Sequence, residues 1–151
     1  MIGDPQQGQT VTECRIFTVE EAERTLPLVN RILSDLRMEY AIWREAMASY
    51  ELLAAGSRAE SGETAELVSS RVAVTVAANR ISDCLLELES IGCLFKGFDE
   101  GLVDFYALRH DRLVLLCWKL GEHRITHWHE VDAGFAGRQP IDSALFSAVV
   151  P

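Results

Sequence analysis

Apolar residues in the first third of the chain recur at alternating spacings of three and four, the pattern of a helix with one buried face. The series comprises Leu26, Val29, Leu33, Leu36, Tyr40, Trp43, Met47, Tyr50 and Ala54. Thr18 and Glu21 have the spacing of a capping box, which marks a helix start. We therefore predict a helix from Thr18 to about Ala55, with a kink or a break at Pro27, because proline cannot donate a helical hydrogen bond.

A second series with the same spacing predicts a helix from about Glu63 to Ile91. Its members are Leu67, Ser70, Val74, Ala77, Ile81, Cys84, Leu88 and Ile91. Residues 56–62 are small, polar and flanked by glycines, so we predict a turn there and an antiparallel hairpin of the two helices. Bulky aromatic residues should face small residues across this hairpin and form its core. The expected pairs are Tyr40 with Ala77, Trp43 with Ala73, and Tyr50 with Ser70.

The second helix carries more apolar residues than one partner helix can cover. Those outside the series are Val68, Val72, Val76, Leu85 and Leu86. Because exposed apolar patches mark contact surfaces, we expect a homo-oligomer, most simply a dimer, that buries Val68, Val72, Val76 or their neighbours.

After Gly92 the period of the apolar pattern falls from 3.6 to 2, which is typical of strands. We predict strands over residues 93–98, 102–108, 112–120 and 125–131, followed by a loop over 133–140. The predicted fold class is therefore α+β. A long, coiled-coil-like antiparallel helical hairpin (residues 18–92) precedes a small three- to four-stranded antiparallel sheet within a β-meander (residues 93–141). Residues 1–13 are expected to form a flexible tail, and residues 14–151 a single domain.

Composition narrows the classes of function. The formal net charge of −9 argues against nucleic-acid partners and against an anionic membrane surface, since both are bound mainly through Lys and Arg. No apolar run approaches the roughly 20 residues that span a bilayer. The four cysteines form no CxxC pair, and the first residues resemble no secretory signal. We therefore expect reduced thiols and a cytoplasmic location.

Chemistry-bearing residues concentrate between Gly101 and Ile141, where all four histidines lie. His127 and His129 stand two apart in a predicted strand, so they should share one face. A divalent metal needs such ligands to converge with a third. We name His127, His129 and Asp132 as candidate metal ligands, with Asp104 as an alternative carboxylate. The competing interpretation has one histidine packed and the other solvated. The sequence indicates no other cofactor.

Cys117 is another candidate for the third metal ligand, but strand register decides whether it lies on the same face as His127 and His129. A four-residue connection, Gly121–Arg124, would pair Leu120 with Ile125. Cys117 would then lie across from Trp128, on the face opposite both histidines. We therefore predict a buried thiol that binds no metal.

Five further residues of this segment are candidates for ligand binding. They are Asp104, Trp118, Trp128, Glu130 and Arg138. We expect His129 to lie within reach of a carboxylate in a pocket walled by Trp118 or Trp128. The planar guanidinium of Arg138 can bind a carboxylate or phosphate through two N–H groups. The alternative is that its Gly-rich loop forms only a tight turn, with Phe135 in the core. No motif identifies a catalytic residue.

Several short motifs together resemble one bacterial family. They are Phe17-Thr18-x-Glu20-Glu21-Ala22 with Leu26-Pro27, Gly101-Leu102-Val103-Asp104-Phe105, Leu116-Cys117-Trp118-x-Leu120-Gly121-Glu122, Trp128-His129-Glu130 and Gly134-Phe135-x-Gly137-Arg138-Gln139-Pro140-Ile141. On these residues the chain, from Arg15 to Ile141, resembles the uncharacterised family called domain of unknown function 2203. This resemblance implies no activity and no site residues.

The chain departs from that family's pattern at three positions. Tyr106 stands where the family usually has Pro, Asp111 where it usually has Gly, and His127 where it often has an aromatic residue. The last departure makes His129 the better single candidate for a site.

Two functions of different classes follow from these observations. The first is a non-enzymatic module that assembles with itself or with a partner, which the surplus apolar surface of the second helix favours. The alternative is a metal- or small-ligand-binding domain, with hydrolysis as one chemistry, whose site lies at the C-terminal β-hairpin around His129. Metal analysis of the purified protein separates the two.

Overall fold

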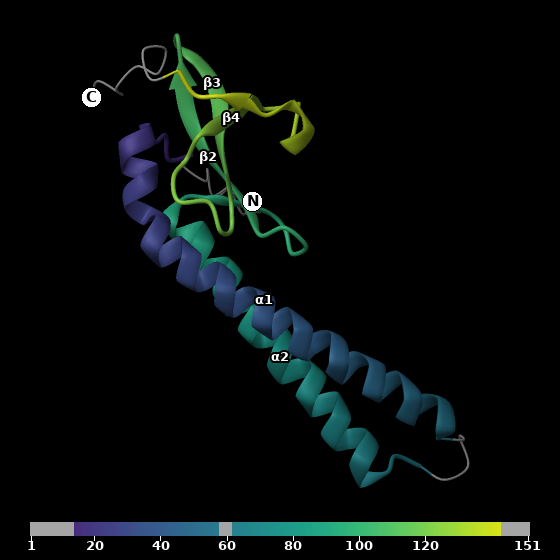
Figure 1. Ribbon diagram of the computed structural model, residues 1–151. Helices are drawn as coiled ribbons and strands as arrows, with labels where there is room; N and C mark the ends of the chain where they lie inside the picture. Colours follow the sequence, from purple (N-terminus) through teal and green to yellow (C-terminus); the bar gives the residue numbers. More distant parts are fainter. Residues whose placement is uncertain (1–13, 58–61, 143–151) are drawn as a thin grey trace, which may run out of the picture.

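Two long helices and an antiparallel sheet make up the part of the chain that the computed structural model describes, residues 14–57 and 62–142 (Figure 1). The elements are α1 (Val19–Gly56), α2 (Ala65–Ile91), β1 (Leu94–Gly97), β2 (Leu102–Arg109), β3 (Arg112–Lys119), β4 (His127–Glu130), the short 3-10 helix η1 (Phe135–Gly137) and β5 (Gln139–Pro140). The α+β prediction, a helical hairpin followed by an antiparallel sheet, is confirmed. The predicted tail, residues 1–13, and part of the predicted turn, residues 58–61, lie outside the described residues.

Both helices begin at the threonines that their sequences favour. The hydroxyl of Thr18 accepts the N–H of Glu21 at 3.1 Å, which confirms the predicted cap. Thr64 caps α2 in the same way, through the N–H of Leu67 at 3.1 Å. At the other end of α2, Gly92 has φ 100°, a left-handed conformation that suits glycine.

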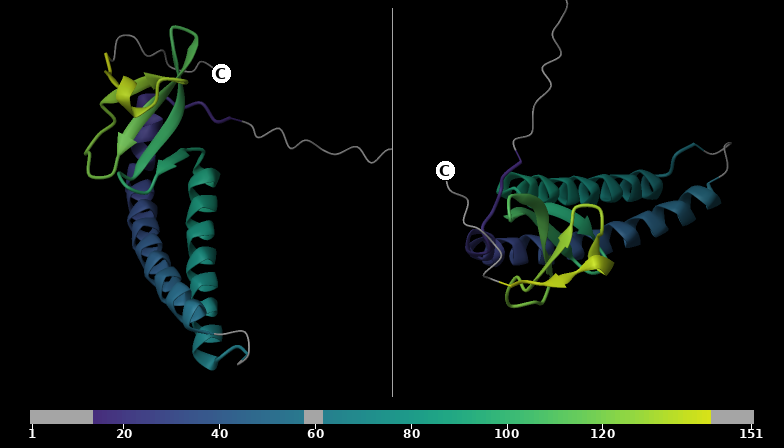
Figure 2. Two further views of the ribbon diagram at one scale, coloured as in Figure 1. Left: turned by 90° about the vertical axis from the view of Figure 1, so that its right-hand side faces the viewer. Right: turned by 90° about the horizontal axis from the view of Figure 1, so that it is seen from above.

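Of the two alternatives predicted at Pro27, a kink or a break, the break is wrong, because α1 continues through this residue. Figure 2 shows α1 curving along its length beside α2 without interruption. Leu26, Val29 and Leu33 around the proline are buried in the core. Their burial holds the helical path, so the missing hydrogen bond of one proline does not end the helix.

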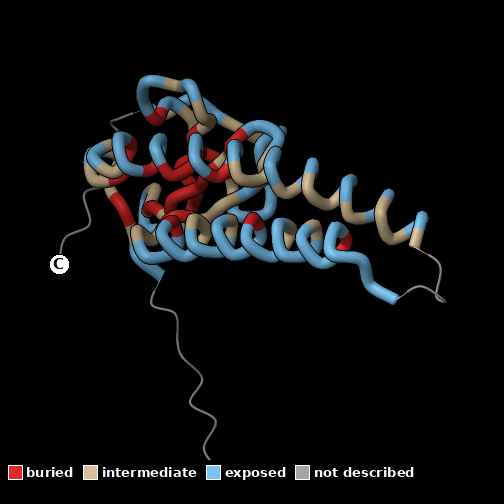
Figure 3. The backbone as a smooth tube through the Cα atoms, turned by 90° about the horizontal axis from the view of Figure 1, so that it is seen from below, coloured by how far each residue is buried: buried red, intermediate tan, exposed pale blue. Residues whose placement is uncertain are grey.

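The core lies where the first half of α1 and the end of α2 meet the sheet, as the buried segments in Figure 3 show. The buried residues of α1 all fall between Ala22 and Leu36. The aromatic residues farther along are half-buried, so they lie outside the buried core, and their facing of small residues on α2 stays a prediction. Tyr40 turns to stack on Phe98, with ring centroids 4.1 Å apart, because the turn after β1 offers an aromatic partner. Within the described residues, no helix combines the length and hydropathy needed to cross a membrane.

The sheet has five strands in chain order, each antiparallel to its neighbour, and two faces of different character. The inner face packs against the helices with apolar residues, namely Val103, Phe105, Ala107, Val114, Leu116, Trp118 and Trp128. The outer face, turned away from the helices, carries Asp104, Tyr106, Leu115, Cys117 and His129, as the strand pairing requires. Directly paired residues share a face, so register alone brings Asp104 beside Cys117.

The predicted register between β3 and β4 is wrong. Cys117 pairs with His127, and Leu115 pairs with His129, so Cys117 shares the outer face with both histidines. The reason is the connection between the strands, which is longer than a four-residue hairpin. The carboxylate of Glu122 accepts the N–H of Lys119 at 2.9 Å, and strand pairing resumes only at His127. The connection therefore has an odd number of residues instead of four, which moves Cys117 to the same face as the histidines.

The connection is held to α1 as well. The N–H of Ile125 donates to Glu23 Oε1 at 3.3 Å, and the Ile125 side chain is buried in the core. Ile125, which we predicted as the first residue of the fourth strand, thus contacts α1 instead. The predicted loop over residues 133–140 contains η1 and the fifth strand, whose Gln139 pairs with Trp128.

Candidate functional site

Three side chains that can ligate a metal are buried together on the outer face. Asp104, Cys117 and His129 come from the neighbouring strands β2, β3 and β4, and each is at most 2% exposed. One ligand atom from each lies within 4.8 Å of the other two. In the described part of the chain, this is the one group of three or more His, Cys, Asp or Glu residues with such spacing. We call it the Asp–Cys–His cluster.

A cavity of about 240 Å³ opens over the Asp–Cys–His cluster. Its other walls are Lys96, Leu102, Val131, Gly134 and Phe135. The last three belong to the segment that follows β4 and folds back over the outer face. This segment explains why polar residues on the side away from the helices are buried.

Arg138 fastens the covering segment to the end of β3. Its Nη2 donates to the carbonyl of Cys117 at 3.2 Å and to both carboxylate oxygens of Glu122 at 2.9 Å. Its guanidinium also lies over the ring of Phe135, 4.9 Å from the centroid. Arg138 therefore positions the wall of the cavity, and the proposed anion fork is occupied by a carboxylate of the chain itself.

The hydrogen bonds of His129 define its tautomer. Its Nδ1 lies 2.7 Å from the carbonyl oxygen of Glu130, which can only accept, so Nδ1 carries the proton. Its Nε2 lies 3.1 Å from Asp104 Oδ2. In a neutral imidazole this Nε2 has only a lone pair, and a carboxylate oxygen also has only lone pairs. A proton or a cation must therefore lie between them.

Asp104 is held in surroundings that disfavour its charge. Burial raises the pKa of its carboxyl, an effect that outweighs the opposing influence of His129, Cys117 and Lys96. Its second oxygen, Oδ1, is buried and has no hydrogen-bond partner among the described residues. A buried acceptor without a donor is costly, so this oxygen is available to a ligand.

Cys117 is a poor nucleophile in these surroundings. Burial and the neighbouring carboxylate of Asp104 raise the pKa of its thiol to about 12, so the thiol is protonated at neutral pH. Nucleophilic cysteines instead need a depressed pKa and a base aimed at the sulfur. A divalent cation would reverse this balance, because metal coordination deprotonates a thiol. The cluster is therefore better suited to a metal than to covalent catalysis.

The structure brings together some of the predicted site residues and separates others. The expected carboxylate partner of His129 is confirmed, because Asp104 lies 3.1 Å from it. The predicted tryptophan walls are wrong, since Trp118 and Trp128 lie on the inner face and belong to the core. Trp118 donates its Nε1–H to the carbonyl of Glu122 at 3.0 Å.

Three other candidates lie near the cluster but outside it. Glu130 contributes its backbone carbonyl to His129, while its carboxylate pairs with Arg112 at 2.8 Å. His127 is half-buried and lies 2.8 Å from Thr126 Oγ1 through its Nδ1. Asp132 is exposed in the turn after β4.

Cys117 is the candidate ligand that sequence reasoning missed. The prediction of a buried, reduced thiol is confirmed, because Cys117 is free and 1% exposed. The prediction that it faces away from the histidines is wrong. The signal that favours the observed register is Gly121-Glu122, where a carboxylate three residues after Lys119 can accept its N–H and end the strand there.

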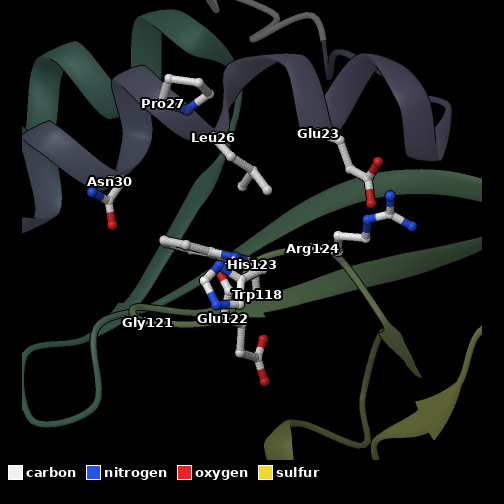
Figure 4. A pocket seen from close by; sticks show the side chains of 9 residues that line it. All are labelled: Glu23, Leu26, Pro27, Asn30, Trp118, Gly121, Glu122, His123 and Arg124. Carbon is white, nitrogen blue, oxygen red and sulfur yellow. Dashed lines mark hydrogen bonds between the residues drawn. The ribbon is translucent and has the colours of Figure 1, made fainter.

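A wider pocket, about 520 Å³, lies between α1 and the connection after β3 (Figure 4). Leu26 and Pro27 line it from the helix, and the ring of Trp118 lines it from the sheet. Figure 4 shows the carboxylate of Glu122 pointing away from the helix, in keeping with its bond to Arg138. Glu23 on the pocket wall already accepts the N–H of Ile125. This pocket lacks a converging set of ligands, so the Asp–Cys–His cluster is the better candidate site.

Comparisons with known proteins place the chain in a family without naming an activity. Searches of the curated proteins and of the solved structures find no match. The family model described as uncharacterized conserved protein (DUF2203) matches residues 15–141. The matched segment includes both helices, all five strands and the three residues of the cluster. The chain therefore belongs to the DUF2203 family.

Proposed function

We propose that this protein binds a divalent transition metal, Zn²⁺ above all, through Asp104, Cys117 and His129. The observation that carries the proposal is the close approach of His129 Nε2 and Asp104 Oδ2, which one shared cation would satisfy, in a buried site beside a thiol. One oxygen, one sulfur and one imidazole nitrogen make a donor set that suits Zn²⁺. The bond from Nδ1 to the carbonyl of Glu130 is the kind of outer-shell contact that orients a metal-binding histidine.

The geometry needs only small adjustments to take the metal. Tetrahedral zinc, with ligands at about 2.0–2.3 Å, places neighbouring ligand atoms about 3.3–3.8 Å apart. The ligand atoms of the cluster lie within 4.8 Å of one another, so side-chain rotations suffice. Three protein ligands leave a fourth position, which would face the cavity of about 240 Å³. An open position is typical of catalytic zinc, and hydrolysis by a metal-bound water is the reaction class it favours.

This proposal requires Cys117 to remain a thiol. All four cysteines are free, and Cys93 and Cys117 are buried. Such thiols persist in reducing compartments, so we infer a cytoplasmic location. The two buried thiols, Cys93 in the core between α2 and β1 and Cys117 on the outer face of the sheet, also provide a matched pair for experiment.

The test is metal analysis of protein purified without a histidine tag, followed by competition with a chelator of known affinity. We expect one zinc per chain in the wild type, and affinity at least about 100-fold weaker in Cys117→Ala and in His129→Ala. Cobalt substitution adds a direct readout, because thiolate coordination produces a charge-transfer band that Cys117→Ala should abolish. Cys93→Ala is the matched control and should keep both metal and band. Wild-type protein that takes up no stoichiometric zinc or cobalt overturns the proposal.

A second property is independent of the metal. We propose that two copies of the chain associate through α2, whose Val68, Val72 and Val76 are 37%, 54% and 43% exposed. From position 67 to 82 this helix contains no acidic residue, in a chain of net charge −9. Its two arginines in that range, Arg71 and Arg80, are paired with Glu63 and Glu39. An uncharged apolar strip is where two acidic chains can approach with the least repulsion.

Light scattering at micromolar concentration tests this association. We expect a dimer mass for the wild type and a monomer mass for Val72→Glu, because the new charge would be buried between copies. Leu52→Glu introduces the same charge at a 77% exposed position of α1 and should leave the dimer intact. A wild-type monomer, or equal effects of the two variants, contradicts the proposal.

A further inference from the structure

We infer that the cavity above the Asp–Cys–His cluster takes a small monocarboxylate, with one oxygen on the metal and the other on the ammonium of Lys96. This inference rests on the proposed metal site and adds the class of ligand that the site would hold. Three features of the cavity carry it: the charge balance, the position of Lys96, and the apolar walls.

Charge balance favours a single negative charge on the ligand. A divalent cation with the thiolate of Cys117, the carboxylate of Asp104 and the neutral imidazole of His129 has a net charge of zero. Lys96, which lines the same cavity, adds one positive charge. The ammonium is therefore the one formal charge left beside a neutral metal centre, and it attracts a monoanion, which brings the filled site to neutrality.

The backbone of β1 presents Lys96 to the cavity. Phe95 pairs with Val103 and Gly97 pairs with Leu102, which leaves Lys96 as the extra residue of a β-bulge. Bulges recur beside binding sites because they redirect one side chain out of the regular pairing. Lys96 is exposed yet lines the cavity, so it stands at the entrance, where a flexible ammonium can reach an incoming anion.

Lysine is scarce in this protein. The chain has 14 basic residues, of which Lys96 and Lys119 are the two lysines. Arg138, the other cation close to the cluster, is already bound to Glu122. Lys96 forms no ion pair among the described residues, although its charge lowers the pKa of Asp104 through space. Its ammonium can therefore still form a direct contact with a ligand.

The walls of the cavity indicate an apolar body behind the carboxylate. Leu102, Val131 and Phe135 line it, and Phe135 is 40% exposed. A volume of about 240 Å³ is below the roughly 300–1,000 Å³ of sites for larger ligands. The fitting class is therefore a short-chain or single-ring carboxylic acid.

The experiment titrates cobalt-loaded protein with butyrate and benzoate, and with butyramide and benzamide as neutral analogues of the same shape. Entry of a carboxylate oxygen into the fourth position should change the visible cobalt spectrum, whereas the amides should leave it unchanged. We expect Lys96→Met to weaken carboxylate binding roughly tenfold, since it removes a charge-assisted contact. Lys119→Met removes the same charge outside the cavity and should bind as the wild type does.

The outcomes separate this inference from the metal site beneath it. Cobalt that binds with a spectrum insensitive to both acids leaves the metal site standing and overturns the carboxylate inference. Equal weakening by Lys96→Met and Lys119→Met overturns the role of Lys96. Equal responses to acids and amides overturn the charge argument. Failure to bind cobalt at all overturns the metal site and the inference together.

Discussion

The two faces of the same sheet bury their residues for different reasons. On the inner face, Val103 and Phe105 are 0% exposed and belong to the hydrophobic core. On the outer face, Asp104 and His129 are the buried polar side chains among the described residues. Apolar burial stabilises a fold, whereas burial of a carboxylate costs stability. Buried polar groups that cost stability are typical of a functional site.

A half-buried polar pair beside the cluster shows how a carboxylate serves the fold. Arg138 and Glu122 form an ion pair at 2.9 Å, and the carboxylate also accepts the N–H of Lys119. Both oxygens of Glu122 have donors. Asp104 differs, because its Oδ1 has none. The contrast separates a carboxylate whose two oxygens are both used within the fold from one that has a buried oxygen without a donor.

The largest effect is expected on the inner face. Phe105→Ala should lower the free energy of unfolding by about 3–5 kcal/mol, because it empties a fully buried site and removes the edge-on contact with Phe17 at 5.1 Å. Urea denaturation of metal-free protein measures this. Leu113→Ala, at a 40% exposed position of β3, is the control and should cost less than about 1 kcal/mol. Similar losses of unfolding free energy at the two positions would contradict the role of the inner face as the stabilising core.

The outer face should respond in the opposite direction. Because burial raises the pKa of Asp104, the folded protein keeps its proton to higher pH than the unfolded chain does. Stability is then lost as pH rises above the ordinary value of 3.8. Asp104→Asn should therefore stabilise metal-free protein at pH 7 by about 1 kcal/mol, while abolishing tight metal binding.

The pH dependence provides the check on that prediction. The advantage of Asp104→Asn should shrink as the pH falls toward 4, where the wild-type carboxyl regains its proton. The same change at Asp99, an exposed turn residue, should alter stability little at any pH. A destabilising effect of Asp104→Asn in metal-free protein would mean that the carboxylate holds the fold, as Glu122 does.

The smallest effect is expected at the tip of the β2–β3 hairpin, which belongs to neither face. His110 and Asp111 have φ of 50° and 59°, a left-handed conformation that costs residues with a side chain about 1 kcal/mol. Asp111→Gly should therefore raise the free energy of unfolding by up to about 1 kcal/mol. Thermal unfolding measures the change, and metal affinity should not move.

The helices were predictable because their signals are local. Thr18 and Glu21 lie three residues apart, and the apolar spacing of α1 repeats over adjacent turns. Which residues of the helices enter the core, and what they pack against, was less predictable. Tyr40 has the right spacing for the hairpin seam, yet it stacks on Phe98 from the sheet. Helical periodicity identifies a face but does not say which partner covers it.

The site was predictable in part, for a similar reason. Alternation within β4 places His127 and His129 on one face. Because β3 lies between β2 and β4, a carboxylate of β2 can lie near these histidines. Cys117 was misplaced because register depends on the length of the connection after Lys119. That length is set by contacts with distant parts of the chain, the bond from Ile125 to Glu23 spanning 102 positions.

Periodicity, capping and the concentration of histidines and carboxylates follow from neighbouring residues, so the order of elements and the region of the site can be read from the chain alone. The joining of Asp104, Cys117 and His129 depends on three strands meeting in one register. Their burial depends on the segment that Arg138 holds over them. A shift of one residue would move Cys117 to the other face of the sheet, because side chains alternate along a strand. No local pattern fixes that parity, since it arises from hydrogen bonds between segments that meet only in the folded protein.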